Sequence, residues 1–134
     1  MTCSFSLDCM MDSSGSVHFT VSEPETITGI SGTIDGNGGE LTFDNEVLAF
    51  PVLADGQVIP VSAPYLLIKT LRGGYIGACG TDGDLLRVQI NDSYKDNALM
   101  LDIWLNSTNK PVCADILYKG RRYLTLQIDN FTLL

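Results

Sequence analysis

The chain has no Lys or Arg before residue 69, although Asp and Glu account for 16 of its 134 residues. Nine of these acids precede Lys69, which leaves the N-terminal half with a net charge of −9, whereas the remainder has eight bases against seven acids. Proteins that bind nucleic acid need a basic surface to neutralise phosphates. We therefore expect no nucleic-acid partner. The acidic half either serves solubility or forms a face for a basic partner.

Long apolar segments are missing as well. No run approaches the roughly 18 to 20 apolar residues of a membrane-spanning helix, and no secretory signal precedes the first predicted strand. We expect contact with a membrane only through an N-terminal anchor that is absent from this chain. The apolar content of 45% is nevertheless sufficient for a hydrophobic core, and the length predicts a single domain over residues 1–134.

Histidine is scarce, because His18 is the only one in the chain. It alternates with Val17 and Phe19, which predicts a place on the polar face of a strand, and neither a Gly-x-Ser-x-Gly motif nor a phosphate-loop spacing occurs. We find no catalytic constellation and predict a binding protein that is not an enzyme and has no cofactor. Trp104 shares a strand face with Asp102, as a binding contact or as a side chain packed under a loop.

Neither the cysteines nor the acids are spaced as in a metal site. The four cysteines have no C-x-x-C spacing and are Cys3, Cys9, Cys79 and Cys113. Cys3 and Cys9 share strand parity with Leu7, which favours inward-pointing free thiols, and one disulfide is the alternative that export would permit. Residues 35–40 have acid and amide spacing that could bind calcium, but a hairpin turn explains them better because the later bidentate Glu is missing.

Alternation of apolar and polar residues is the dominant pattern in the chain. It predicts short strands bounded by turn residues, at residues 3–11, 16–22, 27–35, 40–44, 47–50, 75–79, 86–90, 99–105, 113–119 and 121–129. Residues 51–61 are predicted as a loop with a turn at Asp55-Gly56. The last two strands form a hairpin whose tip is Lys119-Gly120 or Gly120-Arg121.

One segment in the middle of the chain has helical spacing instead. Leu67 and Leu71 are four residues apart, Ser62 is placed to cap the N-terminus, and Gly73 ends the pattern. A helix over residues 62–72 is too short to be stable alone, so its apolar side must pack on other elements. The predicted fold class is mainly β (α+β), a strongly curved antiparallel sheet or incomplete barrel with this helix on its concave face.

The order of these elements resembles a known family. The chain closes with a Pro-x-x-Ala-x-Ile strand that begins at Pro111, a hairpin at Gly120 and a last strand that runs to Phe131. It opens with an apolar strand, a second strand, a Ser-Glu-Pro break at residues 22–24 and a Thr-Gly-Ile stretch at residues 28–30. In order and spacing, nearly the whole chain resembles small bacterial exported lipoproteins with the lipoprotein-carrier (LolA/LolB-like) fold, of the type found in Gram-positive gut bacteria.

The resemblance implies an extracytoplasmic, membrane-anchored lipoprotein of a Gram-positive bacterium, with an apolar cavity that holds acyl chains in the carriers. We expect a non-catalytic domain that binds or shields a lipid-like ligand between sheet and helix. The expected apolar lining is Phe5, Leu7, Phe19, Val21, Ile30, Leu67, Leu71, Leu101 and Ile103. The alternative is a cell-envelope protein–protein interaction or structural module whose core is filled by its own side chains.

Overall fold

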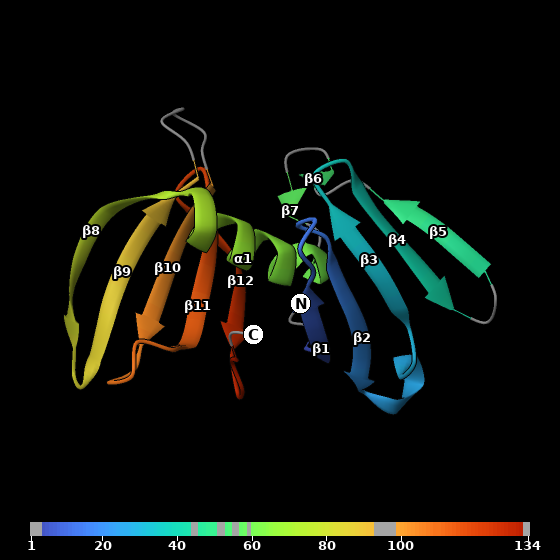
Figure 1. Cartoon of the computed structure of the whole chain (residues 1–134), viewed down its shortest axis with the longest axis horizontal. Coiled ribbons are helices and arrows are strands. Elements are labelled where there is room, and N and C mark those ends of the chain that lie inside the picture. Colours follow the sequence, from blue (N-terminus) through green and yellow to red (C-terminus); the bar gives the residue numbers. More distant parts are fainter. Residues whose placement is uncertain are drawn as a thin grey trace. The chain divides into compact units, whose positions relative to one another are not determined.

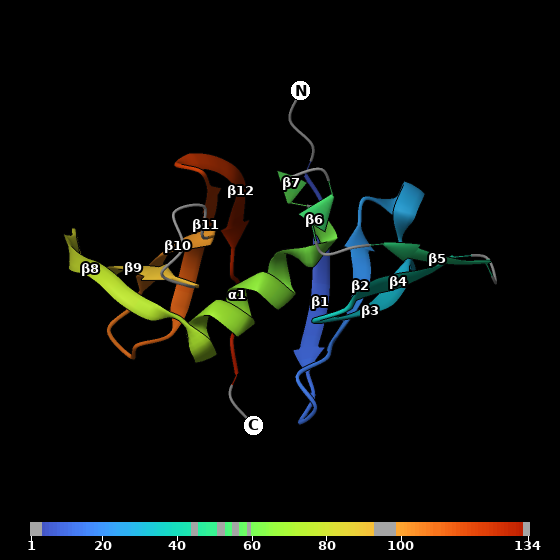
Figure 2. The same cartoon turned by 90° about the horizontal axis from the view of Figure 1, so that it is seen from above.

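A computed structural model describes residues 4–43, 46–50, 53–54, 57–58, 60–92 and 99–132. The chain divides into two compact units, unit 1 (Met1–Tyr65) and unit 2 (Leu66–Leu134). Each unit contains one five-stranded antiparallel sheet in which consecutive strands are neighbours (Figures 1 and 2). The prediction of a mainly β fold with antiparallel strands is therefore confirmed. The strand pairings of the described residues give two five-stranded sheets, however, where the sequence predicted one.

The sheet of unit 1 is a meander in the order β1-β2-β3-β4-β5 (Figure 1). Its strands are β1 (Ser6–Met11), β2 (Val17–Glu23), β3 (Ser31–Asp35), β4 (Gly38–Phe43) and β5 (Glu46–Phe50). A short 3-10 helix, η1 (Glu25–Ile27), follows β2, so the third strand begins later than the alternation from Ile27 predicted. The cause is local, because the carbonyl of Pro24 accepts a hydrogen bond from the Ile27 N–H at 3.1 Å.

Alternation decides which face of this sheet is apolar. Val17, Phe19 and Val21 are buried, and His18 and Thr20 between them are exposed. The register places Gly32 beside Phe19 on the apolar face, where an added Cβ would lie 2.7 Å from the Phe19 ring and 2.1 Å from the backbone oxygen of Glu40. Gly32 thus lets the Phe19 ring lie directly against the backbone of β3.

Unit 1 also contains a small ladder that the sequence did not predict. Strands β6 (Leu53–Ala54) and β7 (Gln57–Val58) pair with each other in the segment that was expected to be a loop, and the expected turn at Asp55-Gly56 lies outside the described residues. The 3-10 helix η2 (Pro60–Ser62) follows. Two-residue strands are too short to show a period of two, which explains why the prediction was wrong here.

The sheet of unit 2 is a second meander, in the order β8-β9-β10-β11-β12. Its strands are β8 (Tyr75–Asp82), β9 (Leu85–Asn91), β10 (Leu99–Leu105), β11 (Pro111–Tyr118) and β12 (Arg121–Gln127). Leu101 and Ile103 on the central strand are buried, with Ile116 and Ala114 directly opposite them on β11. Lys119 and Gly120 both have positive φ, so the β11–β12 turn is centred on this pair, the first of the two predicted positions.

Helix α1 (Ala63–Gly73) begins within one residue of its predicted start and ends one residue later than predicted. Leu67 is buried and Leu71 is half-buried. The Gly74 N–H donates to the carbonyl of Thr70 at 2.9 Å, which closes the C-terminal turn. The predicted cap is wrong: Ser62 is fully buried in η2, and its hydroxyl has no hydrogen-bond partner among the described residues.

Candidate functional site

The polar face of the unit 1 sheet is hollowed. One hollow of about 460 Å³ is lined by residues of β1 to β4, namely Asp8, Cys9, Met10, His18, Phe19, Thr20, Ser31, Gly32, Thr33 and Thr42. The register aligns two polar rows across the strands, one from Asp8 to Thr20 and Ser31, and one from His18 to Thr33 and Glu40. Several hydroxyls, the carboxylate of Asp8 and the imidazole of His18 therefore line this hollow.

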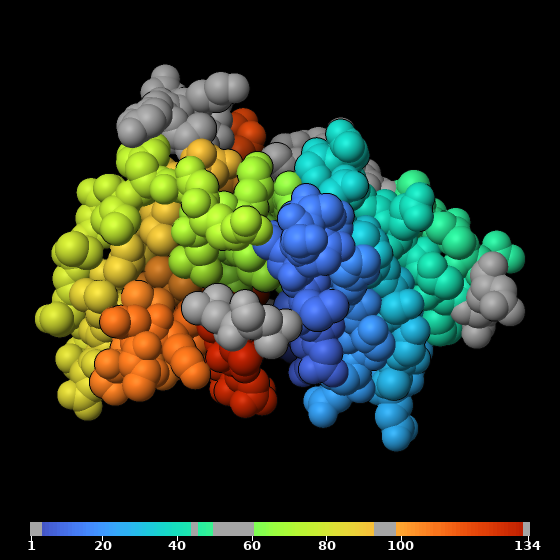
Figure 3. All heavy atoms as spheres, in the orientation of Figure 1, coloured from blue at the N-terminus to red at the C-terminus, as the bar shows by residue number. Residues whose placement is uncertain are grey.

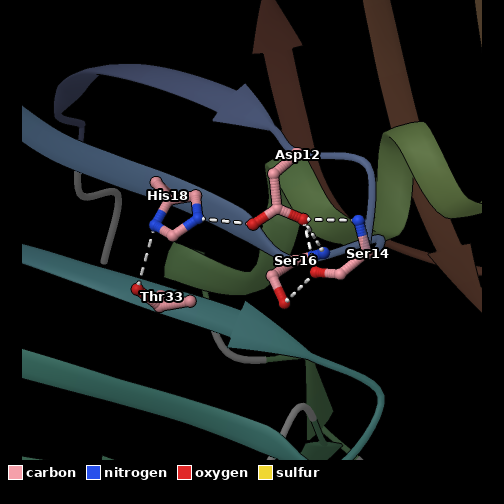
Figure 4. A network of polar contacts seen from close by, with 5 residues as sticks. All are labelled: Asp12, Ser14, Ser16, His18 and Thr33. Atoms are coloured by element: carbon pink, nitrogen blue, oxygen red, sulfur yellow. Dashed lines mark hydrogen bonds and ion pairs between the residues drawn. The ribbon is translucent and has the colours of Figure 1, made fainter.

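His18, which lines this hollow, lies between Thr33 and Asp12 in a polar cluster (Figure 4). Its Nε2 lies 2.8 Å from Asp12 Oδ2, and the Thr33 hydroxyl lies 3.3 Å from its Nδ1. Asp12 Oδ1 accepts the backbone N–H of Ser14 at 2.9 Å and that of Ser16 at 3.2 Å. We call these five residues the His18 cluster; the carboxylate of Asp12 holds the β1–β2 turn and the ring together.

The same hydrogen bonds perturb Asp12. The hydroxyl of Ser14 first, and then the ring of His18, hold the pKa of the Asp12 carboxyl well below its usual range. Each donor favours the ionised carboxylate over the protonated acid. Asp12 is consequently a stable anion over the whole neutral and mildly acidic range, suited to fixing a turn rather than to exchanging protons.

The order hydroxyl, imidazole, carboxylate is also that of a nucleophilic triad. Such chemistry needs backbone or side-chain donors that are free to stabilise an oxyanion. Thr33 lies on β3, whose backbone is paired on both sides by β2 and β4, and the His18 side chain is 48% exposed. The geometry therefore supports a structural role for the His18 cluster, and the surface position predicted for His18 is confirmed.

A second hollow, of about 650 Å³, adjoins the first on the same sheet. It is lined by Thr33, Asp35, Asn37, Gly38, Gly39, Glu40 and Ala49. Asp35 Oδ1 accepts the backbone N–H of Asn37 at 2.8 Å, which confirms the hairpin turn predicted for residues 35–40. Because unit 1 has no Lys or Arg, the carboxylates around both hollows give this face a negative potential.

A different polar cluster covers the corresponding face of unit 2. Asp102, at the centre of β10, is 5% exposed, and the Arg87 guanidinium donates to it through both Nε and Nη2, with Nε 2.9 Å from Oδ1. Arg87 also lies 5.4 Å from the centre of the Trp104 ring, whose Nε1–H donates to Asp82 at 3.0 Å. We call these four residues the Asp102 cluster.

The neighbouring strand extends this cluster. Asp115 lies directly opposite Asp102 on β11 and accepts the Thr125 hydroxyl at 2.9 Å, while Arg122 lies 3.6 Å from its other oxygen. The hydrogen bonds and charge of Asp102 raise the pKa of Arg87 further above its already high value. Because the carboxylates of Asp102 and Asp115 both have cationic partners, their charges are balanced within the cluster. Trp104 belongs to it, so the structure supports packing rather than an open contact for that ring.

The predicted ligand-lining residues divide between the two units. In unit 1, Leu7 lies opposite Val21 and shares its face with Phe19, while Phe5 and Ile30 are half-buried beyond the ends of β1 and β3. In unit 2 the remaining four lie on β10 and α1, namely Leu101, Ile103, Leu67 and Leu71. Each group shares an element or an apolar face within its own unit. Of the nine, Phe19 alone also lines a hollow described above.

In each of the two sheets, apolar side chains on one edge strand are exposed. In unit 1, Leu48 on β5 follows Phe19 and Leu41 along one row of the apolar face and is 64% exposed, and Phe43 on that face is 46% exposed. In unit 2, Ile76 on β8 lies opposite the buried Ile90 and is 66% exposed. The sequence did not predict that these residues are exposed. Alternation identifies the apolar face of a strand but does not specify which residues on that face are covered by other side chains.

The burial of one cysteine, Cys9, differs from the prediction. The three that are described are free; Cys9 and Cys79 are exposed and Cys113 is half-buried. Cys9 lies opposite Phe19, as its parity predicted, but the expectation that it is buried is wrong because β1 is an edge strand with a neighbour on one side alone. Cys3 lies outside the described residues. Within the described ranges, no three His, Cys, Asp or Glu side chains gather closely enough to hold a metal ion.

Within the described part of the chain, α1 and the other helices fall short of the length and apolarity needed to cross a membrane. Comparison with known proteins finds no matching family model, no matching curated protein and no matching solved structure.

Proposed function

We propose that this protein is a non-catalytic, extracytoplasmic binding domain of the lipoprotein-carrier type. In this proposal the strands form a strongly curved sheet with α1 on its concave side, as the resemblance implies, and an apolar, lipid-like ligand is held between sheet and helix. The location outside the cytoplasm, with attachment of a Gram-positive lipoprotein through an N-terminal anchor, rests on the resemblance in element order described above.

One observation favours apolar binding over the other functions. In unit 1, the apolar face includes Val17 and Ile34, which are completely buried. The same face extends to Leu48 on the edge strand β5, which is exposed. Unit 2 repeats this arrangement, from the buried Ile103 to the exposed Ile76. Apolar side chains left exposed in continuity with a core are typical of surfaces that a ligand or partner covers.

The test is binding of a neutral apolar fluorescent probe such as N-phenyl-1-naphthylamine to the folded protein. We expect saturable fluorescence enhancement that fatty acid or a non-ionic detergent below its micellar concentration reverses. Binding should change little between low and high salt, because burial of apolar area does not depend on screened charges. Absence of enhancement, or enhancement that acyl compounds leave unchanged, would contradict the proposal.

A second candidate function is protein–protein interaction, with both apolar faces covered by the protein's own side chains. The observation that favours it is β5, where residues 46–49 are all exposed although the strand belongs to a regular sheet. Native mass spectrometry after mild purification separates the two candidates. A retained ligand mass supports the first, and a ligand-free protein that also fails to bind the apolar probe supports the second.

A further inference from the structure

We propose that β5 is a docking edge for an extended partner segment that alternates basic and apolar residues and adds to unit 1 as a sixth strand. This inference deepens the second candidate function, because it identifies the edge that binds and the chemistry of the partner. Three observations support this inference. The side chains of β5 are exposed on both faces, the edge lacks the features that commonly block pairing with another chain, and unit 1 is acidic.

The first observation is exposure. Val47 on the polar face is 63% exposed and Leu48 on the apolar face is 64% exposed. Glu46 and Ala49 are exposed as well. A strand whose side chains are open on both faces has no cover over either side of its backbone, and alternate N–H and C=O groups of an edge strand point away from the sheet.

The second observation is the regularity of this edge, whose atoms lie on the surface of unit 1 at the right of Figure 3. All five residues of β5 pair in uninterrupted register with β4, and neither a bulge nor a proline interrupts the strand. Natural sheets commonly block an edge with Lys, Pro or a bulge, because an unblocked edge templates the pairing of another chain. Pairing of an extended segment with such an edge is an established mode of peptide recognition.

The third observation decides the chemistry of the segment. Unit 1 has nine acids and no Lys or Arg, so a second copy of unit 1 would be repelled at this edge and a basic segment would be attracted. In an added strand, residues opposite Val47 and Ala49 point to the polar face. On that face, Glu40 of β4 lies directly opposite Ala49. Lysine stems would cover Val47 while their ammonium groups reach the acids, and apolar residues would cover Leu48.

The probe is a labelled, end-blocked heptapeptide of alternating Lys and Val, with binding followed by fluorescence anisotropy. Two matched peptides separate the contribution of charge from that of backbone hydrogen bonding. One replaces Lys by Glu. The other keeps every side chain but is N-methylated at alternate valines. We expect the Lys–Val peptide to bind and to weaken as salt rises. Both matched peptides should bind at least about tenfold more weakly, because one reverses the charge and the other cannot complete the ladder.

Two protein variants with the same change in net charge locate the site. Glu40→Lys reverses the exposed charge opposite Ala49 on the polar face, and Glu25→Lys reverses an exposed charge on η1. We expect about a tenfold loss of peptide affinity in Glu40→Lys and less than about a twofold loss in Glu25→Lys, since the peptide lysines would lie on the polar face near residue 40. In the complex with unmodified protein, amide hydrogens of residues 46–50 should become protected from exchange.

Protection at residues 46–50 together with these differences supports the proposal. It is overturned if the Lys–Val peptide does not bind, if the N-methylated peptide binds equally well, or if both variants lose affinity equally, which would indicate diffuse charge attraction. The neutral apolar probe provides a separate readout. Peptide failure with intact probe binding eliminates the docking edge alone, whereas probe failure with intact peptide binding eliminates the apolar ligand alone.

Discussion

Arg87 and Asp102 form a two-point ion pair across neighbouring strands of unit 2, with Arg87 Nε 2.9 Å from Asp102 Oδ1. The two side chains differ in exposure, at 46% for Arg87 and 7% for Asp102. The carboxylate is therefore a buried charge whose partner reaches it from the surface. Such an arrangement stabilises the fold weakly when complete and destabilises it strongly when one partner is missing.

This asymmetry gives the first prediction. Arg87→Met retains most of the apolar stem but leaves Asp102 as an unpaired buried charge, so the midpoint of urea denaturation should fall clearly below that of the unmodified protein. The double variant Arg87→Met with Asp102→Leu removes both charges and should recover most of that loss. Urea denaturation of the three proteins measures the difference. A double variant no more stable than Arg87→Met would show that the unpaired charge of Asp102 does not cause the loss of stability.

The second prediction concerns Asp12 and pH. The pKa of Asp12 is lowered in the folded state by Ser14 and His18, so its stabilising effect is complete above the unfolded pKa of about 4 and is lost as pH falls toward the folded value. Asp12→Asn should lower the melting temperature at pH 7, and the difference from the unmodified protein should shrink steadily from pH 4 to pH 2. A difference that stays constant over this range would mean that the turn geometry, and not the charge, matters.

The third prediction concerns Gly32. An added Cβ would lie 2.1 Å from the Glu40 backbone oxygen and 2.7 Å from the Phe19 ring, and the backbone of a paired strand has little freedom to move away. Gly32→Ala should therefore reduce the free energy of unfolding by about 1 to 3 kcal/mol or more. Gly36→Ala is the matched control, because its nearest neighbour, the Tyr65 hydroxyl, lies at an ordinary 3.5 Å. Equal stability of the two variants would contradict the packing described here.

The fourth prediction compares two leucines of α1. Leu67 is 6% exposed, so Leu67→Ala should lower the free energy of unfolding by about 2 to 5 kcal/mol. Leu71 is half-buried, and Leu71→Ala should cost less than Leu67→Ala because fewer contacts and less apolar area are lost. Thermal or chemical denaturation measures both. A loss below about 0.5 kcal/mol for Leu67→Ala would mean that the helix does not contribute its apolar side to a core.

Much of the local structure could be predicted from the sequence, because alternation is a local property of a strand. The buried Val17 and Phe19, the exposed His18 and the helix near Leu67 all follow from periods of two or 3.6 residues. The division into two sheets does not, since a period identifies strands without specifying which pairs form. Turn residues such as Lys119-Gly120 fixed the connections between neighbouring strands, but nothing local specifies pairing across the segment that precedes α1.

The candidate sites show the same limit. Parity placed Trp104 and Asp102 on one strand face, yet their links to Asp82 and Arg87 depend on the register between strands, which the sequence pattern leaves open. Exposure at an edge is equally invisible to alternation. Cys9 and Leu48 both have the parity of the apolar face, and both are exposed because they lie on edge strands.

The most direct measurement of the central claim compares Leu48→Asp with Val47→Asp. The two residues are adjacent on β5 and have nearly equal exposure, but Leu48 belongs to the apolar face and Val47 to the polar face. Each variant adds one negative charge, so effects of net charge are matched. If the open apolar face binds the ligand, Leu48→Asp should weaken binding of the neutral apolar probe by about tenfold, and Val47→Asp should leave it within about twofold. Equal probe affinities for the two variants, with both still folded, would contradict the account.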